Sequence, residues 1–380
     1  MLPDSNQSAS IAPIIPPLGN HGRPTKEFKT YNHHLVVHFD VNETILVGDD
    51  AGGDTRLDCL NKLLAKSAFV RMPDKSKVSY EETSSVIPTH WWDGTLIGDD
   101  SACGKSIPPL YIGWEWPEGC CPYYRTSFKK KSKTFTDHDG APYRVTLEKV
   151  DDILEHRGVS DLPVLNHMLP AFFKTLEYLS RTTQKTTIVI RTFGNDLPDI
   201  AKAVTAFAQG YHPDYPHFLD KNLIMEPECI VTGRWQQSAD GRTVYRLFQG
   251  DTQVAAGDEE VLAFIHSRTI CGIQDDYPFW RSNGYEPWSG KPVWKLPDVQ
   301  HVLLDDNIHN LEHDSIASVR ECTASGMFES LTSQEIRHEQ GTHLIRVPTI
   351  APILHPDWFL EMIDKAQEKF SLGTAENHTS

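Results

Sequence analysis

Short runs of apolar residues recur along the chain, separated by longer stretches in which apolar residues follow helical spacing. Runs of this length predict buried β-strands, and they occur at 35–40, 186–191, 301–306 and 343–348. Because these strands alternate with helical segments, we expect right-handed crossovers and a parallel sheet with helices on both faces. The pattern therefore predicts an α/β fold.

Four segments carry the helical spacing. Apolar residues recur at this spacing over 57–68 and over 164–179, where Pro170 either kinks the helix or begins a new one. A further helix is expected at about 312–328, and an amphipathic helix over 358–370 closes the pattern. Placed between and after the predicted strands, these helices have the order that a parallel sheet requires.

Composition divides the chain into a central body and two flanking segments. Residues 1–30 are rich in Pro, Ser and Asn without periodicity, and we expect them to be a disordered N-terminal arm. Residues 371–380 are expected to be a frayed, disordered tail. The body between them, residues 31–370, is expected to be one core that carries two insertions.

The two insertions are stretches that break the alternation of strand and helix. Residues 71–150 are crowded with Trp, Tyr, Pro and Gly, which suggests a β-rich segment. The second stretch covers about 196–290 and contains a hairpin pattern over 229–257, with its turn at Asp240-Gly241. Because both stretches lie between predicted core strands, we expect caps or lids rather than independent domains.

Charge and cysteine usage narrow the classes of partner. Asp and Glu number 52 against 36 Lys and Arg, which gives a net charge of −16. Nucleic acids and anionic membranes need a basic surface, so we expect neither as a partner, whereas a small anionic substrate needs only a local positive site. No apolar run approaches the roughly 18 residues of a membrane helix. The seven cysteines form no C-x-x-C pair, which favours reduced thiols and a cytoplasmic location.

Polar residues follow the ends of the predicted strands, where ligands bind in open parallel sheets. The first strand ends in DVNET, the second in TFG, and a later one in an acidic pair shortly after a lysine. These positions are Asp40, Thr192, Phe193, Gly194, Lys291, Asp305 and Asp306. A carboxylate, a hydroxyl, a cation and a carboxylate pair would therefore meet at one edge of the sheet.

The acidic members of this set suggest a metal site and a nucleophile. A carboxylate attacks phosphorus when its own charge and that of the phosphate are neutralised. Mg²⁺ takes oxygen ligands, usually one or two carboxylates together with waters and a substrate oxygen. Asp40 with Asp305 or Asp306 offers such ligands. The sequence therefore predicts a magnesium site at this edge.

The remaining members suggest a phosphate-binding site. The hydroxyl of Thr192 and the backbone N–H groups of Phe193 and Gly194 would hold the oxygens of the transferred group, and Lys291 would offset the remaining negative charge. Lys295 competes with Lys291 for this role. We favour Lys291 because the proline that follows it suits the first turn of a helix that would present the lysine.

In this order the quartet resembles the four motifs of the haloacid dehalogenase superfamily, and it spans most of the predicted core. The resemblance implies a Rossmann-like parallel sheet with an inserted cap that selects the substrate. It implies Asp40 as nucleophile and magnesium ligand, and the backbone carbonyl of Asn42 as a further ligand. Thr192, Lys291 and the acidic pair match the second, third and fourth motifs. The expected activity is hydrolysis or transfer of a phosphate ester on a small phosphorylated substrate, through an aspartyl-phosphate.

One residue departs from the pattern of the superfamily's phosphatases. They carry a second aspartate two residues after the nucleophile as general acid and base, and this chain has Asn42 there. An amide cannot donate a proton to a leaving oxygen, and such help is worth about 10²–10⁴-fold in rate. The enzyme would then be slow, act on substrates with good leaving groups, or take its acid from the cap. Asp49, Asp50 and Asp54 are the nearest candidates along the chain.

Three alternatives remain open. A catalytically impaired binding or regulatory protein, with a protein partner on the insertions, would explain Asn42. A metal-independent dehalogenase-type hydrolase also lacks the second aspartate, but it does not need an acidic pair at the fourth motif. Structural roles are the simplest alternative, since Asp40 could cap a turn. His33, His34 and His38 raise the further question of a zinc site, which we do not favour.

Overall fold

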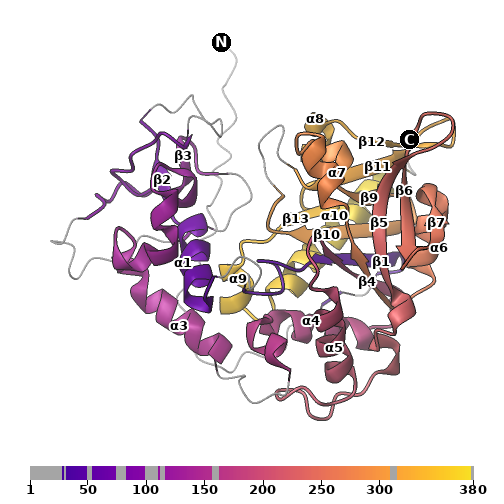
Figure 1. The fold of residues 1–380 in the computed structure, drawn as a ribbon, viewed down its shortest axis with the longest axis horizontal. Coiled ribbons are helices and arrows are strands. Elements are labelled where there is room, and N and C mark those ends of the chain that lie inside the picture. Colours follow the sequence, from indigo (N-terminus) through magenta and orange to yellow (C-terminus); the bar gives the residue numbers. More distant parts are fainter. Residues whose placement is uncertain are drawn as a thin grey trace. The chain divides into compact units, whose positions relative to one another are not determined.

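The computed structural model describes residues 28–29, 31–48, 54–73, 83–98, 110–111, 116–155, 162–308 and 315–377 (Figure 1). They divide into two compact units. Residues 61–147 belong to the smaller unit, and residues up to 60 together with those from 148 belong to the larger one. Apart from Phe28 and Lys29, the expected N-terminal arm lies outside the described residues. Across the described part of the chain, no helix combines the length and apolar character needed to cross a membrane.

The larger unit is built on a sheet of eleven strands. Their bounds are β1 His34–Asp40, β4 Thr186–Thr192, β5 Ile230–Gln237, β6 Thr243–Gln249, β7 Thr252–Ala256, β8 Ile270–Gln274, β9 Lys291–Lys295, β10 Val299–Asp305, β11 Ala317–Cys322, β12 Phe328–Ser330 and β13 Leu344–Arg346. The order is β12-β11-β9-β10-β1-β4-β8-β5-β6-β7, and β13 pairs with β10. The neighbours from β10 through β1, β4 and β8 to β5 are all parallel. The fold is therefore mixed α/β with a mostly parallel sheet.

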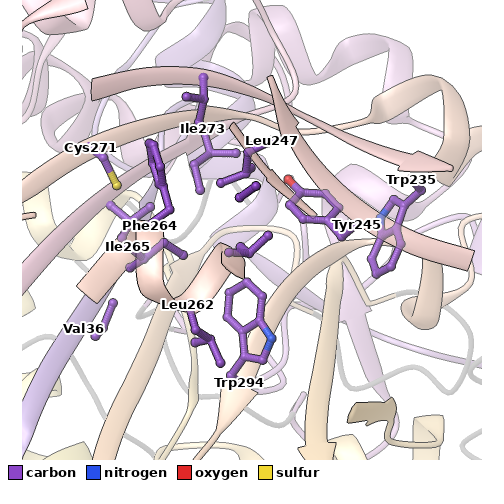
Figure 2. Packing of buried hydrophobic residues seen from close by; sticks show 14 residues of the cluster. Val36, Trp235, Tyr245, Leu247, Leu262, Phe264, Ile265, Cys271, Ile273 and Trp294 are labelled. Atoms are coloured by element: carbon purple, nitrogen blue, oxygen red, sulfur yellow. The ribbon is translucent and has the colours of Figure 1, made fainter. Parts of the chain in front are cut away.

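Alternation along the central strand places side chains on both faces of this sheet. Val36 of β1 joins a core cluster under helix α6 (Gly257–His266). Figure 2 shows this cluster, in which side chains of α6 pack with residues of the strands, among them Trp235, Tyr245, Ile273 and Trp294. Phe39 points to the opposite face, where its ring lies 5.3 Å from Phe172 and 5.5 Å from Phe359. These two residues belong to α4 (Pro170–Arg181) and α10 (Trp358–Asn377). Both faces are thus covered.

The predicted strands and most predicted helices are confirmed. The four apolar runs correspond to β1, β4, β10 and β13, and the first helical segment is α1 (Arg56–Ser67). The second segment is interrupted, because a 3₁₀ helix over Pro163–His167 ends before α4 begins at Pro170. The proline therefore begins a new helix rather than kinking one, as its missing N–H and fixed φ favour.

Two predictions near the end of the chain are wrong. The helix expected at about 312–328 is replaced by β11, whose first four residues are buried and which pairs with β9 on one side and β12 on the other. The buried run reflects a strand covered on both faces, which short apolar segments do not distinguish from a helix. The tail expected at 371–380 is helical as far as Asn377, because α10 continues beyond its amphipathic part, and 378–380 lie outside the described residues.

The stretch 196–290 is not a separate insertion. Its hairpin is confirmed, since β5 and β6 are antiparallel and Gly241 has φ 83° at the turn. However, β5 pairs with β8 and β8 with β4, so these strands extend the main sheet. Val231, Gly233 and Trp235 are buried in alternation along β5. This face of β5 completes the core beneath α6, which accounts for its place in the main sheet. Helix α5 (Leu197–Ala208) lies in the same stretch.

The smaller unit is inserted in the sequence between β1 and β4. Its described residues form the end of α1, two short strands, β2 (Phe69–Arg71) and β3 (Cys120–Pro122), 3₁₀ helices and the beginning of α3 (Arg144–Glu155). The expectation of a β-rich segment over 71–150 is therefore wrong for the described residues. The aromatic residues behind that expectation form a core between turns, in which Trp91 lies 5.5 Å from Tyr143 and 6.2 Å from Phe135.

Candidate active site

The chemical groups singled out in the sequence lie at the carboxyl ends of neighbouring strands. Asp305, Asp40 and Thr192 are the last residues of β10, β1 and β4, which are adjacent and parallel, so all three lie at one edge of the sheet. Strand β9 runs antiparallel to β10, so its first residue, Lys291, points back to the same edge. The topology alone therefore brings a nucleophile candidate, a hydroxyl and a lysine together.

Lys291 joins two carboxylates in the interior. Its Nζ donates to Asp40 Oδ1 at 2.5 Å and to Asp305 Oδ2 at 2.7 Å, and its side chain is only 1% exposed. The rival Lys295, at the other end of β9, is 37% exposed and pairs with Glu321 and Glu339. The expectation of a helix at Pro292 is wrong. Lys291 and Pro292 belong to strand β9, where Pro292 lies opposite Ser318 of β11.

A close approach between two chain segments fixes the beginning of β9. The backbone N–H of Lys291 donates to the carbonyl of Ile316 at 2.7 Å. A Cβ on Gly290 would overlap that same carbonyl, so only glycine allows this approach. The carbonyl of Gly290 also accepts the indole N–H of Trp235 at 3.1 Å. These contacts hold the backbone at Lys291 in place independently of the contacts that the lysine side chain makes.

Three buried carboxylates gather at the edge. Asp40, Asp305 and Asp306 each offer an oxygen, and these oxygens lie within 4.8 Å of one another. Asn307 orients two of them, because its backbone N–H donates to Asp305 and its side-chain amide donates to Asp306, both at 2.8 Å. The ammonium of Lys291, bonded to Asp40 and Asp305, offsets one of the charges that the trio carries when it is ionised. Buried charge of this kind requires compensation by a cation or by protons.

The protonation of the site reflects its burial first and the closeness of its carboxylates second. Burial, and then the charge of Asp305, raise the pKa of Asp40 to about 7, although Lys291 opposes the change. Burial by itself would lower the pKa of Lys291, but the carboxylates of Asp305 and Asp40 outweigh it and raise that pKa above its ordinary value. The lysine therefore stays charged at neutral pH, and Asp40 exchanges a proton there unless a further cation is present.

Thr44 connects the segments that follow β1 and β10. Its hydroxyl donates to Asp40 Oδ2 at 3.2 Å and accepts the backbone N–H of Asp306 at 3.2 Å. The preceding Glu43 has φ 57°, a left-handed conformation that is uncommon outside glycine, and the hydroxyl of Thr349 donates to its carbonyl. Thr44 was not among the expected site residues; its signal in the sequence is a hydroxyl four residues after the carboxylate that it orients.

A second group of contacts surrounds Thr192. Its hydroxyl accepts the backbone N–H of Gly194 at 2.9 Å and donates to Asp196 Oδ2 at 3.3 Å. The side-chain amide of Asn42 donates to that same oxygen at 3.0 Å. The ring of Phe193 lies 5.0 Å from Lys291 Nζ. The structure thus links Asn42 with Thr192 through Asp196, a residue that the sequence analysis did not single out.

A buried ion pair supports the site from the side of β8. Arg191 and Asp275 are joined at 2.5 Å and 2.8 Å, and the hydroxyl of Tyr245 donates to Asp275 at 2.6 Å. Arg191 also donates to the carbonyl of Pro292, directly after the lysine, and the N–H of Asp275 donates to the carbonyl of Thr192. This pair therefore ties together the strands that present Thr192 and Lys291. Its sequence signal is an arginine within an otherwise apolar run.

The histidines near β1 are engaged elsewhere. His38 is buried and bonded to His301 at 2.9 Å, and His301 is bonded to His266 at 3.0 Å. Burial lowers the pKa of both His38 and His301 well below the ordinary value, so both rings are neutral. His33 and His34 bond to Gln300 and Thr187. Within the described ranges, the acidic trio is the one group with the spacing of metal ligands.

The predicted site residues therefore fall into two groups. Asp40, Lys291, Asp305 and Asp306 form one buried cluster, with Phe193 against the lysine. Asn42, Thr192 and Gly194 form the other, around Asp196. No protein-family model, curated protein or solved structure matches the chain. The interpretation of the site therefore depends on its geometry and its chemistry.

Proposed function

We propose that the chain is a magnesium-dependent phosphate-ester hydrolase or phosphotransferase that forms an aspartyl-phosphate on Asp40. The observation that carries the proposal is the buried ammonium of Lys291 between Asp40 and Asp305. A carboxylate that attacks an anionic phosphoryl group needs nearby positive charge, and the lysine supplies it at the strand end. The substrate class that suits such a site is a small phosphate monoester.

Three features support our proposal that the larger unit is a Rossmann-like core of the haloacid dehalogenase type. Its central strands are parallel, helices cover both faces, and the candidate nucleophile ends the strand between β10 and β4. The smaller unit interrupts the sequence after this strand, which is where a substrate-selecting cap is inserted in that superfamily. We propose that residues 61–147 have this role and also offer a surface for a protein partner.

The acidic trio suits Mg²⁺. Asp40, Asp305 and Asp306 would hold the ion together with the backbone carbonyl of Asn42, since Mg²⁺ prefers oxygen ligands and retains several waters. A divalent cation would also offset negative charge of the buried carboxylates that Lys291 does not balance. When bound, the ion neutralises charge on the phosphoryl oxygens.

The remaining steps of the proposed reaction are carried out by side chains and backbone groups of the protein. Asp40 forms the bond to phosphorus, and Thr44 sets the rotation of its carboxylate. Lys291 lowers the electrostatic repulsion between that carboxylate and the phosphoryl group. The hydroxyl of Thr192 would hold a phosphoryl oxygen by turning its proton away from Asp196, while its oxygen keeps accepting the N–H of Gly194. Water then cleaves the bond between Asp40 and phosphorus and releases phosphate.

The test is hydrolysis of an activated aryl phosphate by wild type and Asp40→Asn, each with Mg²⁺ and with a chelator. We expect activity only in wild type with Mg²⁺, while Asp40→Asn keeps its fold because Lys291 still pairs with Asp305. Retained turnover in Asp40→Asn would contradict the mechanism. Activity that persists with the chelator would instead favour metal-independent, dehalogenase-type hydrolysis.

Asn42 favours a second candidate, a catalytically impaired binding or regulatory protein. Its amide occupies the position two residues after the nucleophile and donates to Asp196. This candidate predicts no turnover and no stable complex with Mg²⁺ and beryllium fluoride, which mimics a phosphoryl group on a carboxylate. A thermal shift on adding both would support the enzyme, and the absence of any shift would favour the binding protein.

A further inference from the structure

The site lacks an acid at the position where the resemblance leads one to expect it. Asn42 cannot give a proton to the oxygen that leaves phosphorus. Asp49 and Asp50, two of the carboxylates closest to it in sequence, lie outside the described residues. A carboxylate from the loop after β4 does reach Asn42, because Asp196 Oδ2 accepts its side-chain amide at 3.0 Å.

The carboxylate of Asp196 is turned toward the site rather than toward its own helix. Asp196 directly precedes α5, where an aspartate side chain ordinarily accepts a backbone N–H of the first turn. Here its side chain makes no capping hydrogen bond. It instead accepts the hydroxyl of Thr192 at 3.3 Å and the amide of Asn42. Its orientation therefore serves the ends of β1 and β4 at the expense of the helix cap.

The loop between β4 and α5 is shaped around this carboxylate. A Cβ on Gly194 would overlap Asp196 Oδ2, so a glycine leaves the space that the carboxylate occupies. The N–H of Gly194 also donates to the hydroxyl that contacts Asp196. Glycine thus clears room for the carboxylate and orients its neighbour, two features that a surface aspartate does not need.

We propose that Asp196 is the general acid and base of the reaction, in place of the residue at position 42; this assignment rests on the proposed function. In the first half, an Asp40 oxygen bonds to phosphorus as the phosphorus–oxygen ester bond breaks, and protonated Asp196 gives its proton to the leaving oxygen. In the second half, the Asp196 carboxylate takes a proton from water as the water oxygen bonds to phosphorus. The bond to Asp40 then breaks, phosphate leaves, and Asp196 is protonated again.

The assignment makes a prediction about leaving groups. An activated aryl oxide leaves without a proton, whereas an alkyl oxide needs one, so only the alkyl ester depends on the acid. With Mg²⁺ at saturation and fixed pH, we expect Asp196→Asn to lower kcat/KM for an alkyl phosphate by about 10²–10⁴-fold and to leave kcat/KM for an activated aryl phosphate near wild type. Since the second half also loses its base, the aryl substrate should give a burst followed by slow turnover.

The controls separate catalysis from packing. Asp199→Asn changes an exposed aspartate of the same helix that pairs with Lys202, and we expect it to alter neither substrate's kinetics. The double variant Asn42→Asp, Asp196→Asn keeps the hydrogen bond with donor and acceptor exchanged, and it should restore much of the alkyl phosphate activity. Thermal unfolding of each variant checks that the fold is retained.

Two failures are distinguishable. If Asp196→Asn lowers kcat/KM equally for the alkyl and the aryl phosphate while remaining folded, Asp196 only positions Asn42 and Thr192, and the assignment is overturned although the proposed function stands. If wild type itself hydrolyses no activated aryl phosphate with Mg²⁺, the proposed function is contradicted, and the assignment falls with it.

Discussion

Replacement of Lys291 by Met removes the single ammonium that separates two buried carboxylates. Methionine has a similar length and an apolar end, so the change deletes the charge while it largely preserves the packing. Asp40 and Asp305 then lose partners at 2.5 Å and 2.7 Å. The change therefore tests whether the lysine balances an acidic site or merely fills space.

The structure sets the size of the effect. Removing one partner of a buried ion pair commonly costs about 3–5 kcal/mol, because the other charge is left uncompensated. Proton uptake by Asp40, whose pKa is already raised to about 7, limits the loss, so we expect about 3 kcal/mol near neutral pH without metal. Mg²⁺ at 100 times its dissociation constant would return about 2.7 kcal/mol.

The assay is unfolding in urea, monitored by tryptophan fluorescence, with and without Mg²⁺. Lys295→Met is the matched control, since it makes the same change on the same strand at a lysine that is 37% exposed and pairs with Glu321 and Glu339. Partly exposed pairs are worth about 0–1 kcal/mol, so the control should move the midpoint only slightly. Mg²⁺ should stabilise Lys291→Met more than wild type, because the variant's site has lost its own cation.

Two results would refute this reasoning. Equal destabilisation by Lys291→Met and Lys295→Met would mean that the charge of the buried lysine contributes no more to the free energy of unfolding than the charge of the partly exposed one. A stabilisation by Mg²⁺ that is absent, or the same in wild type and Lys291→Met, would mean that the acidic trio does not bind the ion in competition with the lysine.

Three further predictions concern the carboxylate of Asp40. Burial raises its pKa from 3.8 to about 7, so between these pH values the folded, metal-free protein holds a proton that the unfolded chain has lost; stability should fall as the pH rises through this window and level off above it. Mg²⁺ would replace that proton, so a fixed Mg²⁺ concentration should raise the melting temperature more at about pH 8 than at about pH 6. An equal rise at both pH values would contradict the assignment of Asp40 as a ligand of the ion. Thr44→Val removes the hydroxyl between Asp40 and the N–H of Asp306, and it should cost about 1–3 kcal/mol in urea unfolding and weaken Mg²⁺ binding measured by calorimetry. Unchanged Mg²⁺ affinity would show that Thr44 does not orient the carboxylate.

The central part of the fold was predictable because its strands are continuous apolar runs. The strands β1, β4 and β10 are buried on both faces, and each ends in a polar residue. The apolar run therefore predicts the strand, and the polar residue marks its end. At 312–328 the pattern misled, because β11 is a short strand whose buried residues include Ser318 and Arg320. Arg320 is kept there by an ion pair with Asp258 from α6, a contact between distant segments that local periodicity does not contain.

The candidate site was predictable to the extent that topology determines it. Parallel neighbours bring their carboxyl ends together, so Asp40, Thr192 and Asp305 could be grouped from strand ends alone. Asp196 could not be found this way, because its contact with Asn42 depends on the loop after β4 and on the space that Gly194 leaves. The shape of a loop is set by a few dihedral angles and close approaches, which residue types alone do not fix.

The most direct measurement for the central claim is the location of a phosphoryl group on the protein during turnover. Wild type is mixed with an activated aryl phosphate and Mg²⁺ and quenched in acid within the first turnover. The protein is then digested, and the masses of its peptides are measured by mass spectrometry. The proposed mechanism predicts a phosphoryl group on the peptide that contains Asp40, absent with a chelator and absent in Asp40→Asn. Turnover with no phosphoryl group on that peptide, or with the group on another residue, would contradict it.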